Sequence, residues 1–331
     1  MKTLLLGTGT GCFSMSLENG QWKEAARALP GVEVTALALQ RGAILAGTRK
    51  GVFRSEDRGQ TWLEANSDHS PRYVRWLTSH PSQSRLVFCG TEPASIYLSQ
   101  DGGLTWTDCP EVAQQRDRHG WWLPYSSGAG CVRGFAFHGP RGYAAVEVGG
   151  MLVSENYGQT WRLASGSDGK PQFGKTKTGM IHPDVHSVAV HPSSPDLVFA
   201  PTGGGLYRSR DGGATWELLY ECYCRAAWLD PGDPDHLLFG PADDVDRNGR
   251  IEETRDGGRT WTPAVTGLKV EAERAVWKRG MVERFIAGDA DLFAITSQGG
   301  LLRAPLSSLV WEEVLPASQG VRCGAILETG S

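Results

Sequence analysis

The chain has 331 residues, of which 40% are hydrophobic and 21% charged, with 43 Gly, 18 Pro and 12 Trp, a composition that allows a large buried core rich in turns. Its formal net charge of -4 gives no global attraction for nucleic acid or an anionic membrane, so any basic site has to be local. The first residues lack the apolar run of a signal peptide, no stretch is long enough to cross a bilayer, and the seven scattered cysteines suit reduced thiols, so we expect a cytoplasmic protein.

One eight-residue pattern recurs along the chain and marks tight turns. It reads SEDRGQTW at 55–62, SQDGGLTW at 99–106, SENYGQTW at 154–161, SRDGGATW at 209–216 and TRDGGRTW at 254–261. The Asp, replaced once by Asn156, can accept backbone N–H groups within a turn, and the Gly that follows tolerates positive φ. The closing Trp begins the next strand and offers a large ring to the core. Trp22 and Trp311 stand at the same offset after apolar strands, which makes seven units.

Each unit is predicted to contain four strands. A hairpin precedes each box, as in AILAGTRKGVFRS. Upstream of the hairpins lie further strands, at VEVTALAL, RYVRWLTSH, CVRGFAFH, DVHSVAVH, CYCRAAWLD, AERAVWK and GVRCGAILE. The chain begins within a unit, at TLLLGTG, and ends with an unaccompanied first strand. We therefore predict one all-β domain over residues 1–331, a seven-bladed β-propeller whose N- and C-terminal strands share one blade.

The recurring turns resemble the Asp-box, or BNR, repeats of sialidases, sortilin-type receptors and photosystem II assembly factors. The resemblance covers essentially the whole chain and implies a β-propeller in which the boxes are structural turns remote from the functional site. A sialidase would also need an arginine triad, a tyrosine with a carboxylate partner and an aspartic acid. No positions of this sequence match that set.

Aligning the seven upstream strands places cationic side chains at one shared position. They are Arg75, Arg133, His186, Arg225, Arg274 and Arg322, with Thr35 in the remaining strand. These strands should begin at the face that carries the inter-blade loops, so we expect a ring of positive charge at the top of the central channel. Converging guanidinium groups suit a carboxylate, sulfate or phosphate. Alternatively, they bond to neighbouring carbonyls or to channel carboxylates such as Glu92 and Glu147.

Two long connections, residues 107–130 and 162–183, should rise over the same face. In the first, the rings of Trp121 and Trp122 are suited to stack on a sugar or another flat ligand, or else they only hold the loop in place. The second carries Lys170, Lys175, Lys177 and His182.

Histidines gather where the second connection becomes a strand. His182, Asp184 and His186 alternate, so they share one face, and together with His119 of the first connection they are suited to bind a metal or exchange protons. Ordinary hydrogen bonding within the loop is the alternative.

A further motif, DVDRNGRIE at 244–252, has the spacing of a calcium loop. Asp244, Asp246, Asn248 and Glu252 offer oxygens at positions one, three, five and nine, and the carbonyl of Arg250 stands at position seven. The flanks are predicted strands, so the motif resembles the hairpin calcium loops of integrin-type propellers. A metal-free turn rich in Asp and Asn is the alternative.

These features favour a propeller whose top face recognises an anionic small molecule or an acidic glycan. If the protein is an enzyme, we expect a glycoside hydrolase or lyase in which His119, His186, Glu92 or Glu147 performs the acid–base chemistry. The alternative is a noncatalytic scaffold that holds an acidic protein segment on the same face. Neither function involves nucleic acid or a membrane.

Overall fold

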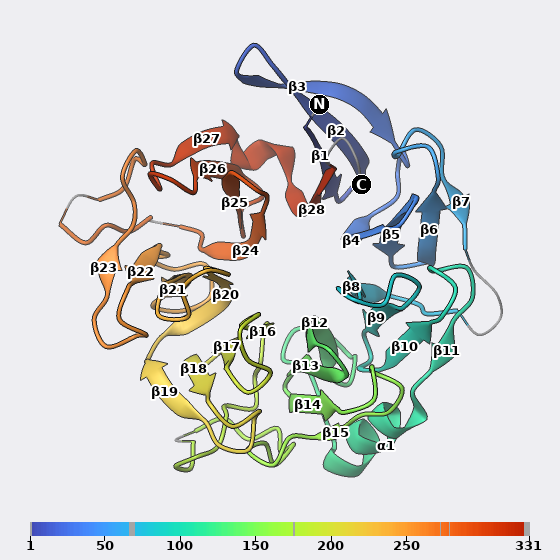
Figure 1. The fold of residues 1–331 in the computed structure, drawn as a ribbon, viewed down its shortest axis with the longest axis vertical. Coiled ribbons are helices and arrows are strands. Elements are labelled where there is room, and N and C mark those ends of the chain that lie inside the picture. Colours follow the sequence, from blue (N-terminus) through green and yellow to red (C-terminus); the bar gives the residue numbers. More distant parts are fainter. Residues whose placement is uncertain (1, 66–69, 175, 272, 278, 328–331) are drawn as a thin grey trace.

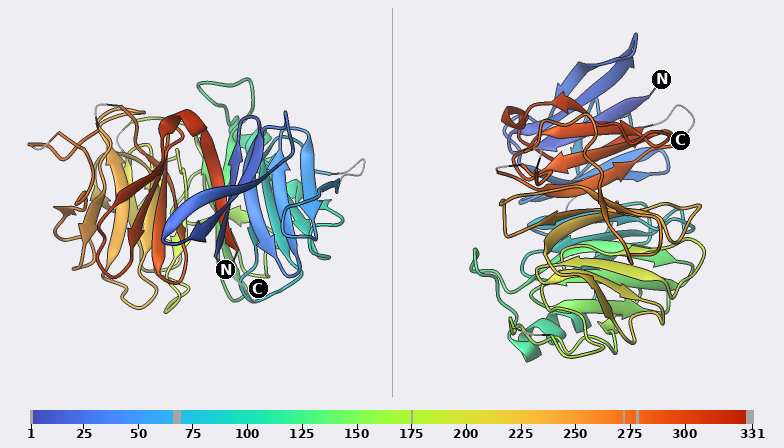
Figure 2. Two further views of the ribbon diagram at one scale, coloured as in Figure 1. Left: turned by 90° about the horizontal axis from the view of Figure 1, so that it is seen from above. Right: turned by 90° about the vertical axis from the view of Figure 1, so that its left-hand side faces the viewer.

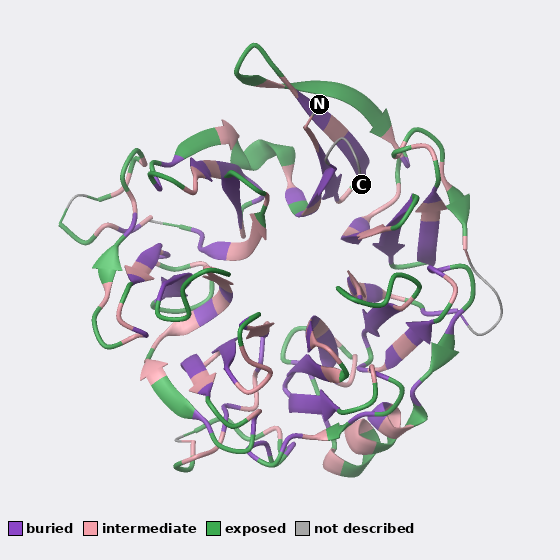
Figure 3. Ribbon diagram, viewed as in Figure 1, coloured by how far each residue is buried: buried purple, intermediate pink, exposed green. Residues whose placement is uncertain are grey.

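The computed structural model describes residues 2–65, 70–174, 176–271, 273–277 and 279–327. Within them, seven four-stranded antiparallel sheets stand around a central channel (Figure 1), which confirms the predicted seven-bladed β-propeller. Buried residues concentrate within the blades, and exposed residues lie mainly along the outer rim (Figure 3). The helix α1 (Pro110–His119) lies on that rim, and none of the described helices is long and apolar enough to span a bilayer.

Each blade leads from an inner strand at the channel to an outer strand at the rim. The inner strands are β28 (Val321–Leu327), β4 (Val34–Gln40), β8 (Val74–Ser79), β12 (Cys131–His138), β16 (Ala189–Val190), β20 (Tyr223–Leu229) and β24 (Val282–Ala287). The second strands are β1 (Thr3–Thr8), β5 (Ala43–Thr48), β9 (Val87–Thr91), β13 (Arg141–Glu147), β17 (Val198–Thr202), β21 (Leu237–Ala242) and β25 (Asp291–Thr296).

The remaining strands complete the blades in the same order. The third strands are β2 (Gly11–Glu18), β6 (Gly51–Ser55), β10 (Ile96–Ser99), β14 (Gly150–Ser154), β18 (Gly205–Ser209), β22 (Glu252–Thr254) and β26 (Leu301–Pro305). The outer strands are β3 (Gln21–Ala28), β7 (Leu63–Glu64), β11 (Thr107–Asp108), β15 (Arg162–Leu163), β19 (Glu217–Tyr220), β23 (Thr262–Pro263) and β27 (Glu312–Leu315). A 3-10 turn, η1 (Ala317–Gln319), precedes β28.

The two ends of the chain close the ring. β28 pairs antiparallel with β1, with Thr3 opposite Leu327 and Gly7 opposite Cys323. Leu4 and Leu6 pack into the cluster that contains residues of the β24–β27 blade, whereas Leu5 packs into the cluster of the β4–β7 blade. Because successive side chains of a strand point to opposite faces, the apolar run TLLL fills the interfaces on both sides of its blade. The predicted closure is therefore confirmed.

The recurring turns are built by their own side chains. In the second copy, Asp101 Oδ1 accepts the N–H groups of Leu104 at 3.0 Å and Thr105 at 2.9 Å, and Ser99 Oγ accepts the N–H of Gly103 at 2.8 Å. These turns join third to outer strands, on the face opposite to the one where the inner strands begin. The boxes thus fix the blades and lie away from the channel entrance.

One inner strand differs from the prediction. Residues 273–277 of AERAVWK lie in a turn, where Ala275 has a φ of 51° and its N–H donates to Glu271 O at 2.7 Å. The inner strand begins later, at Val282, because β25 pairs with that segment instead. The placement of Arg274 on an inner strand is therefore wrong, although AERAVW and the pairing segment VERFIA have the same order of apolar and charged residues.

Candidate functional site

A repeated irregularity in strand pairing points one residue of each inner strand into the channel. Arg75 lies between Val74, opposite Thr91, and Trp76, opposite the adjacent Gly90, so it has no partner on β9. The same register shift occurs in β4, β12, β20, β24 and β28, at Thr35, Arg133, Arg225, Glu283 and Arg322. A β-bulge of this kind redirects the extra residue. In the remaining blade, the backbone N–H groups of His186 and Ser187, just before β16, both donate to Pro201 O, so a similar irregularity occurs there.

Six of these residues, all except the buried His186, line a depression of about 370 Å³ where the inner strands begin, which we call the channel mouth. Its charged lining is Arg49, Arg75, Arg133, Arg225, Arg284, Arg322, Glu33 and Glu283. The predicted ring of arginines is thus present, with Glu283 in the position that the sequence alignment gave to Arg274. Arg274 is instead paired with Asp243 at 3.1 Å, outside this lining.

Glu283 holds two of the arginines together. Its Oε1 lies 2.6 Å from Arg133 Nη2, and its Oε2 lies 2.7 Å from Arg225 Nη1. Since Arg133 is on β12 and Glu283 on β24, the first ion pair spans the channel. Burial would raise the pKa of Glu283, but Arg225 and Arg133 outweigh that effect and hold it below its usual range. The two guanidinium groups therefore bind the Glu283 carboxylate in the way that they would bind the carboxylate of an anionic ligand.

The two predicted catalytic glutamates are also ion-pair partners. Glu92 Oε2 lies 2.9 Å from Arg75 Nη1, and Glu147 Oε2 lies 3.1 Å from Arg133 Nη1. Burial would raise the pKa of Glu147, but Arg133 and other contacts lower it to about 2. Among the described residues, every carboxyl whose pKa is shifted is shifted downward. A carboxylic general acid needs the opposite shift, so Glu147 is held in the form that has no proton to donate.

Arg284 follows the bulge of β24 and crosses the channel. Its Cζ lies 4.0 Å from the centroid of the Trp76 ring on β8, and its Nη2 donates to Thr35 O of β4 at 3.4 Å. Within the described part of the chain, no carboxylate lies at ion-pair distance from Arg284. It faces the same depression as the paired arginines, so the mouth holds one cation that is not neutralised by a contact.

The histidines separate into different environments. His186 is buried; its Nδ1 donates to Cys224 O at 2.7 Å, and its Nε2 lies 3.1 Å from Asp184 Oδ2. With Glu147 they form a group whose ligand atoms lie within 4.8 Å of one another, the arrangement among the described residues that could hold a divalent cation. His182 is not part of it, because its ring accepts the N–H of Asp184 and faces a different hollow. His119 ends α1 on the rim.

The two long connections are fastened to each other above the blades. Trp121 is buried, and its indole N–H donates to Gly169 O at 2.8 Å, so this ring holds the loops in place. Trp122 is 42% exposed and meets Phe173 edge to face, with 5.7 Å between ring centroids. The segment after α1 projects beyond the face where the inner strands begin, as predicted (Figure 2).

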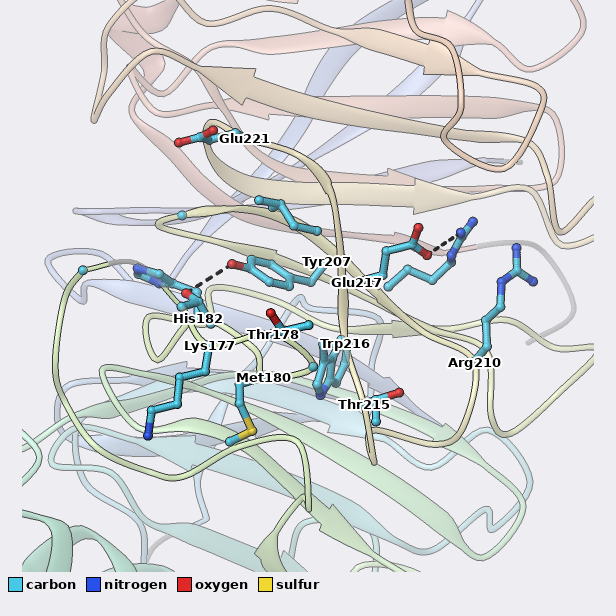
Figure 4. Close-up of a pocket in the computed structure, with 16 residues that line it drawn as sticks. Lys177, Thr178, Met180, His182, Tyr207, Arg210, Thr215, Trp216, Glu217 and Glu221 are labelled. Atoms are coloured by element: carbon cyan, nitrogen blue, oxygen red, sulfur yellow. Dashed lines mark hydrogen bonds and ion pairs between the residues drawn. The ribbon is translucent and has the colours of Figure 1, made fainter.

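A second hollow, of about 1060 Å³, was not predicted from the sequence. It lies along β18 and β19 and is lined by Tyr207, Trp216 and Leu218 together with residues of the second connection (Figure 4). Of the four residues that the sequence analysis names on the second connection, Lys177 and His182 also line this hollow. Lys170 lines a smaller neighbouring pocket, and Lys175 lies outside the described residues. Sequence alone could not identify this hollow, since its walls come from segments about 30 residues apart.

The predicted calcium loop forms an irregular turn between β21 and β22. Asp246 and Asn248 have φ values of 54° and 53°, and Asp244 Oδ1 accepts the N–H of Val245 at 2.8 Å. Glu252 Oε1 accepts the Nε–H of Arg250 at 3.1 Å. Asp246 Oδ1 is buried without a hydrogen-bond partner. The loop carboxylates do not gather around one point as Glu147 and Asp184 do, so calcium binding stays a prediction.

Comparison with known proteins confirms the repeat and the fold. Residues 207–218 match the model of the BNR/Asp-box repeat. The structure described as YCF48 bound to D1 peptide is 14% identical, with a TM-score of 0.61, over 91% of this chain and 87% of that one. The GH74 enzyme of Niastella koreensis is 17% identical, with a TM-score of 0.64, over 95% of this chain and 52% of that one.

Curated sequences point to the same two kinds of propeller protein. The alignment with the xyloglucanase Xgh74A of Acetivibrio thermocellus extends over 221 residues at 27% identity, and it covers 53% of this chain and 23% of that protein. Vacuolar protein sorting/targeting protein 10 of Schizosaccharomyces japonicus is 33% identical over 66 residues, 20% of this chain and 4% of that protein. The chain thus spans less than a quarter of the length of these curated relatives.

Proposed function

We propose that this Asp-box propeller is a noncatalytic binding protein that captures a carboxylate-bearing partner at the channel mouth. The observation that carries the proposal is Arg284, a partly buried guanidinium that lines the mouth without a carboxylate at ion-pair distance among the described residues. A cation withdrawn from water without a counter-ion is costly, and a bound carboxylate would remove that cost.

The electrostatics of the mouth favour binding over catalysis. Glu92, Glu147 and Glu283 are each fixed by an arginine within 3.1 Å. Arg133 and Arg225 hold the pKa values of Glu147 and Glu283 low, so these two carboxylates stay ionised. All three carboxylates orient guanidinium groups, which can then form the paired hydrogen bonds that a carboxylate ligand accepts. Hydrolysis of a glycosidic bond would need a protonated carboxylic acid beside a second carboxylate.

The structural relatives also favour a binding function over catalysis. The YCF48 chain is matched over 87% of its length, whereas the Niastella koreensis GH74 chain is matched over 52%. The former was solved with a peptide, so a propeller of this fold and size binds a polypeptide. For this chain we infer the binding of a polypeptide, and not of the D1 peptide in particular.

Calorimetry with citrate, a small polycarboxylate, tests the proposal. Arg284→Gln and Arg322→Ala should each weaken citrate binding by about 1–3 kcal/mol, the scale of a hydrogen bond to a charged group. Arg274→Ala is the matched control, because that arginine also pairs with a carboxylate but lies outside the mouth. Equal weakening by all three variants, or no citrate binding by the wild type, would contradict the proposal.

A further inference from the structure

Three aromatic rings lie exposed on the two long connections. Tyr125 is 55% exposed, Phe173 48% and Trp122 42%, and we call these three residues the aromatic ridge. Tyr125 reaches the mouth itself, because its hydroxyl lies beside Glu147 and helps to lower the pKa of that carboxyl. Trp122 lies three residues before Tyr125 on the same connection and contacts Phe173 of the second connection edge to face.

The ridge is held in place and is not a loose loop. Trp121 and Leu123, on either side of Trp122, are buried. Leu123 bridges to Ser126, whose hydroxyl donates to Glu92, the carboxylate that also binds Arg75. The backbone of the first connection is thus tied to the charged wall of the mouth. Its aromatic rings are presented to solvent by a supported scaffold, as residues of a binding surface are.

The shape of the ridge suits side chains better than sugar rings. Trp122 and Phe173 meet at 82°, so they form a corner and not a flat platform. A sugar stacks on an open aromatic face, whereas a corner accommodates a branched or aromatic side chain. The arginines next to the ridge require an anionic group in the same partner.

We propose that the mouth and the aromatic ridge form one continuous surface for a polypeptide segment that carries an acidic group beside aromatic or aliphatic side chains. This inference rests on the proposed function, since the mouth supplies the charged half of the surface. The acidic group binds among Arg75, Arg284 and Arg322, and the apolar side chains lie against Tyr125 and in the corner of Trp122 and Phe173. The ridge thereby selects among acidic partners, because charge alone does not distinguish one acidic segment from another.

Fluorescence anisotropy with labelled synthetic peptides tests this inference. Each peptide carries two glutamates, followed at varied spacing by Trp and Leu, and its partner peptide has Ala in place of Trp and Leu. On the wild type, the best apolar peptide should bind about tenfold more tightly than its Ala partner, the scale of one aromatic contact. In the double variant Trp122→Ala, Phe173→Ala this advantage should disappear, and melting curves check that the variant is folded.

Citrate separates this inference from the proposed function. Because citrate is too small to reach the corner, it should bind the double variant as it binds the wild type. Apolar and Ala peptides of equal affinity on the wild type would overturn the ridge proposal while citrate binding still stands. Loss of xyloglucan-oligosaccharide binding in the double variant, with peptide binding unchanged, would assign the ridge to a glycan. Absence of citrate binding to the wild type would remove the proposed function as well.

Discussion

Replacing Glu283 by Gln should destabilise the free protein and strengthen anion binding at the same time. The carboxylate of Glu283 lies 2.6 Å from Arg133 and 2.7 Å from Arg225, and the three side chains are 11–18% exposed. Glutamine keeps one accepting oxygen but loses the charge. The two guanidinium groups then repel each other without a carboxylate between them.

The two effects can be sized separately. Removing one partner of a buried ion pair costs about 3–5 kcal/mol, and since Gln retains one hydrogen bond and the site is partly open, we expect a loss of about 2 kcal/mol. The mouth also gains one unit of positive charge. At a separation of about 6 Å and an effective dielectric of about 20, one further pair of charges contributes about 3 kcal/mol before salt screening. We therefore expect citrate to bind at least about tenfold more tightly.

Urea unfolding with and without citrate measures both effects. Citrate at about 100 times its Kd should stabilise the folded variant by about 2.7 kcal/mol, which offsets the expected loss. The matched control is Asp291→Asn, because Asp291 also lies between two cations, Lys2 and Arg303, each at 2.7 Å. That variant should lose stability without rescue by citrate. An unchanged urea midpoint for Glu283→Gln, or stronger citrate stabilisation of the wild type than of the variant, would refute this reasoning.

Three further predictions concern closure, acid stability and calcium. Deleting residues 319–331 removes β28 and should abolish cooperative unfolding, because β1 then becomes a free edge; a truncated chain that melts as sharply as the full chain would count against closure by β28. The pKa of Glu147 is lowered from 4.5 to about 2, so its contribution of about 3 kcal/mol is fully present above pH 4.5 and is lost as the pH falls to 2, a dependence that Glu147→Gln should flatten in acid titrations. Chelation should lower the melting temperature and calcium should restore it, an effect that Asp246→Ala removes; a metal-free preparation that shows no shift with calcium contradicts the calcium prediction.

The turns of the boxes and the closure of the ring could be predicted, whereas the register of one inner strand could not. The boxes are predictable because Asp101 and Ser99 satisfy the turn from within four residues. Closure is predictable because an apolar strand without a hairpin has to find a partner. The register of an inner strand depends on its neighbour, and AERAVW has the same order of apolar and charged residues as VERFIA, the segment that pairs. The sequence therefore favours Arg274 at the position that Glu283 occupies, and Glu283 bonds to Arg133 from 150 residues away.

The position of Glu283 makes the channel mouth asymmetric. An unbroken ring of cations at the bulges would repel itself, and one carboxylate on β24 counters this by binding Arg133 and Arg225. The arginine of that strand stands one residue later, at Arg284, and reaches across to Trp76 on β8. Arg284, the cation without a contacting carboxylate, therefore lies on the opposite side of the channel, where Arg75 also lies. Tyr125 adjoins that side, so the charged and aromatic parts of the surface meet where a partner's carboxylate has the least competition from Glu283.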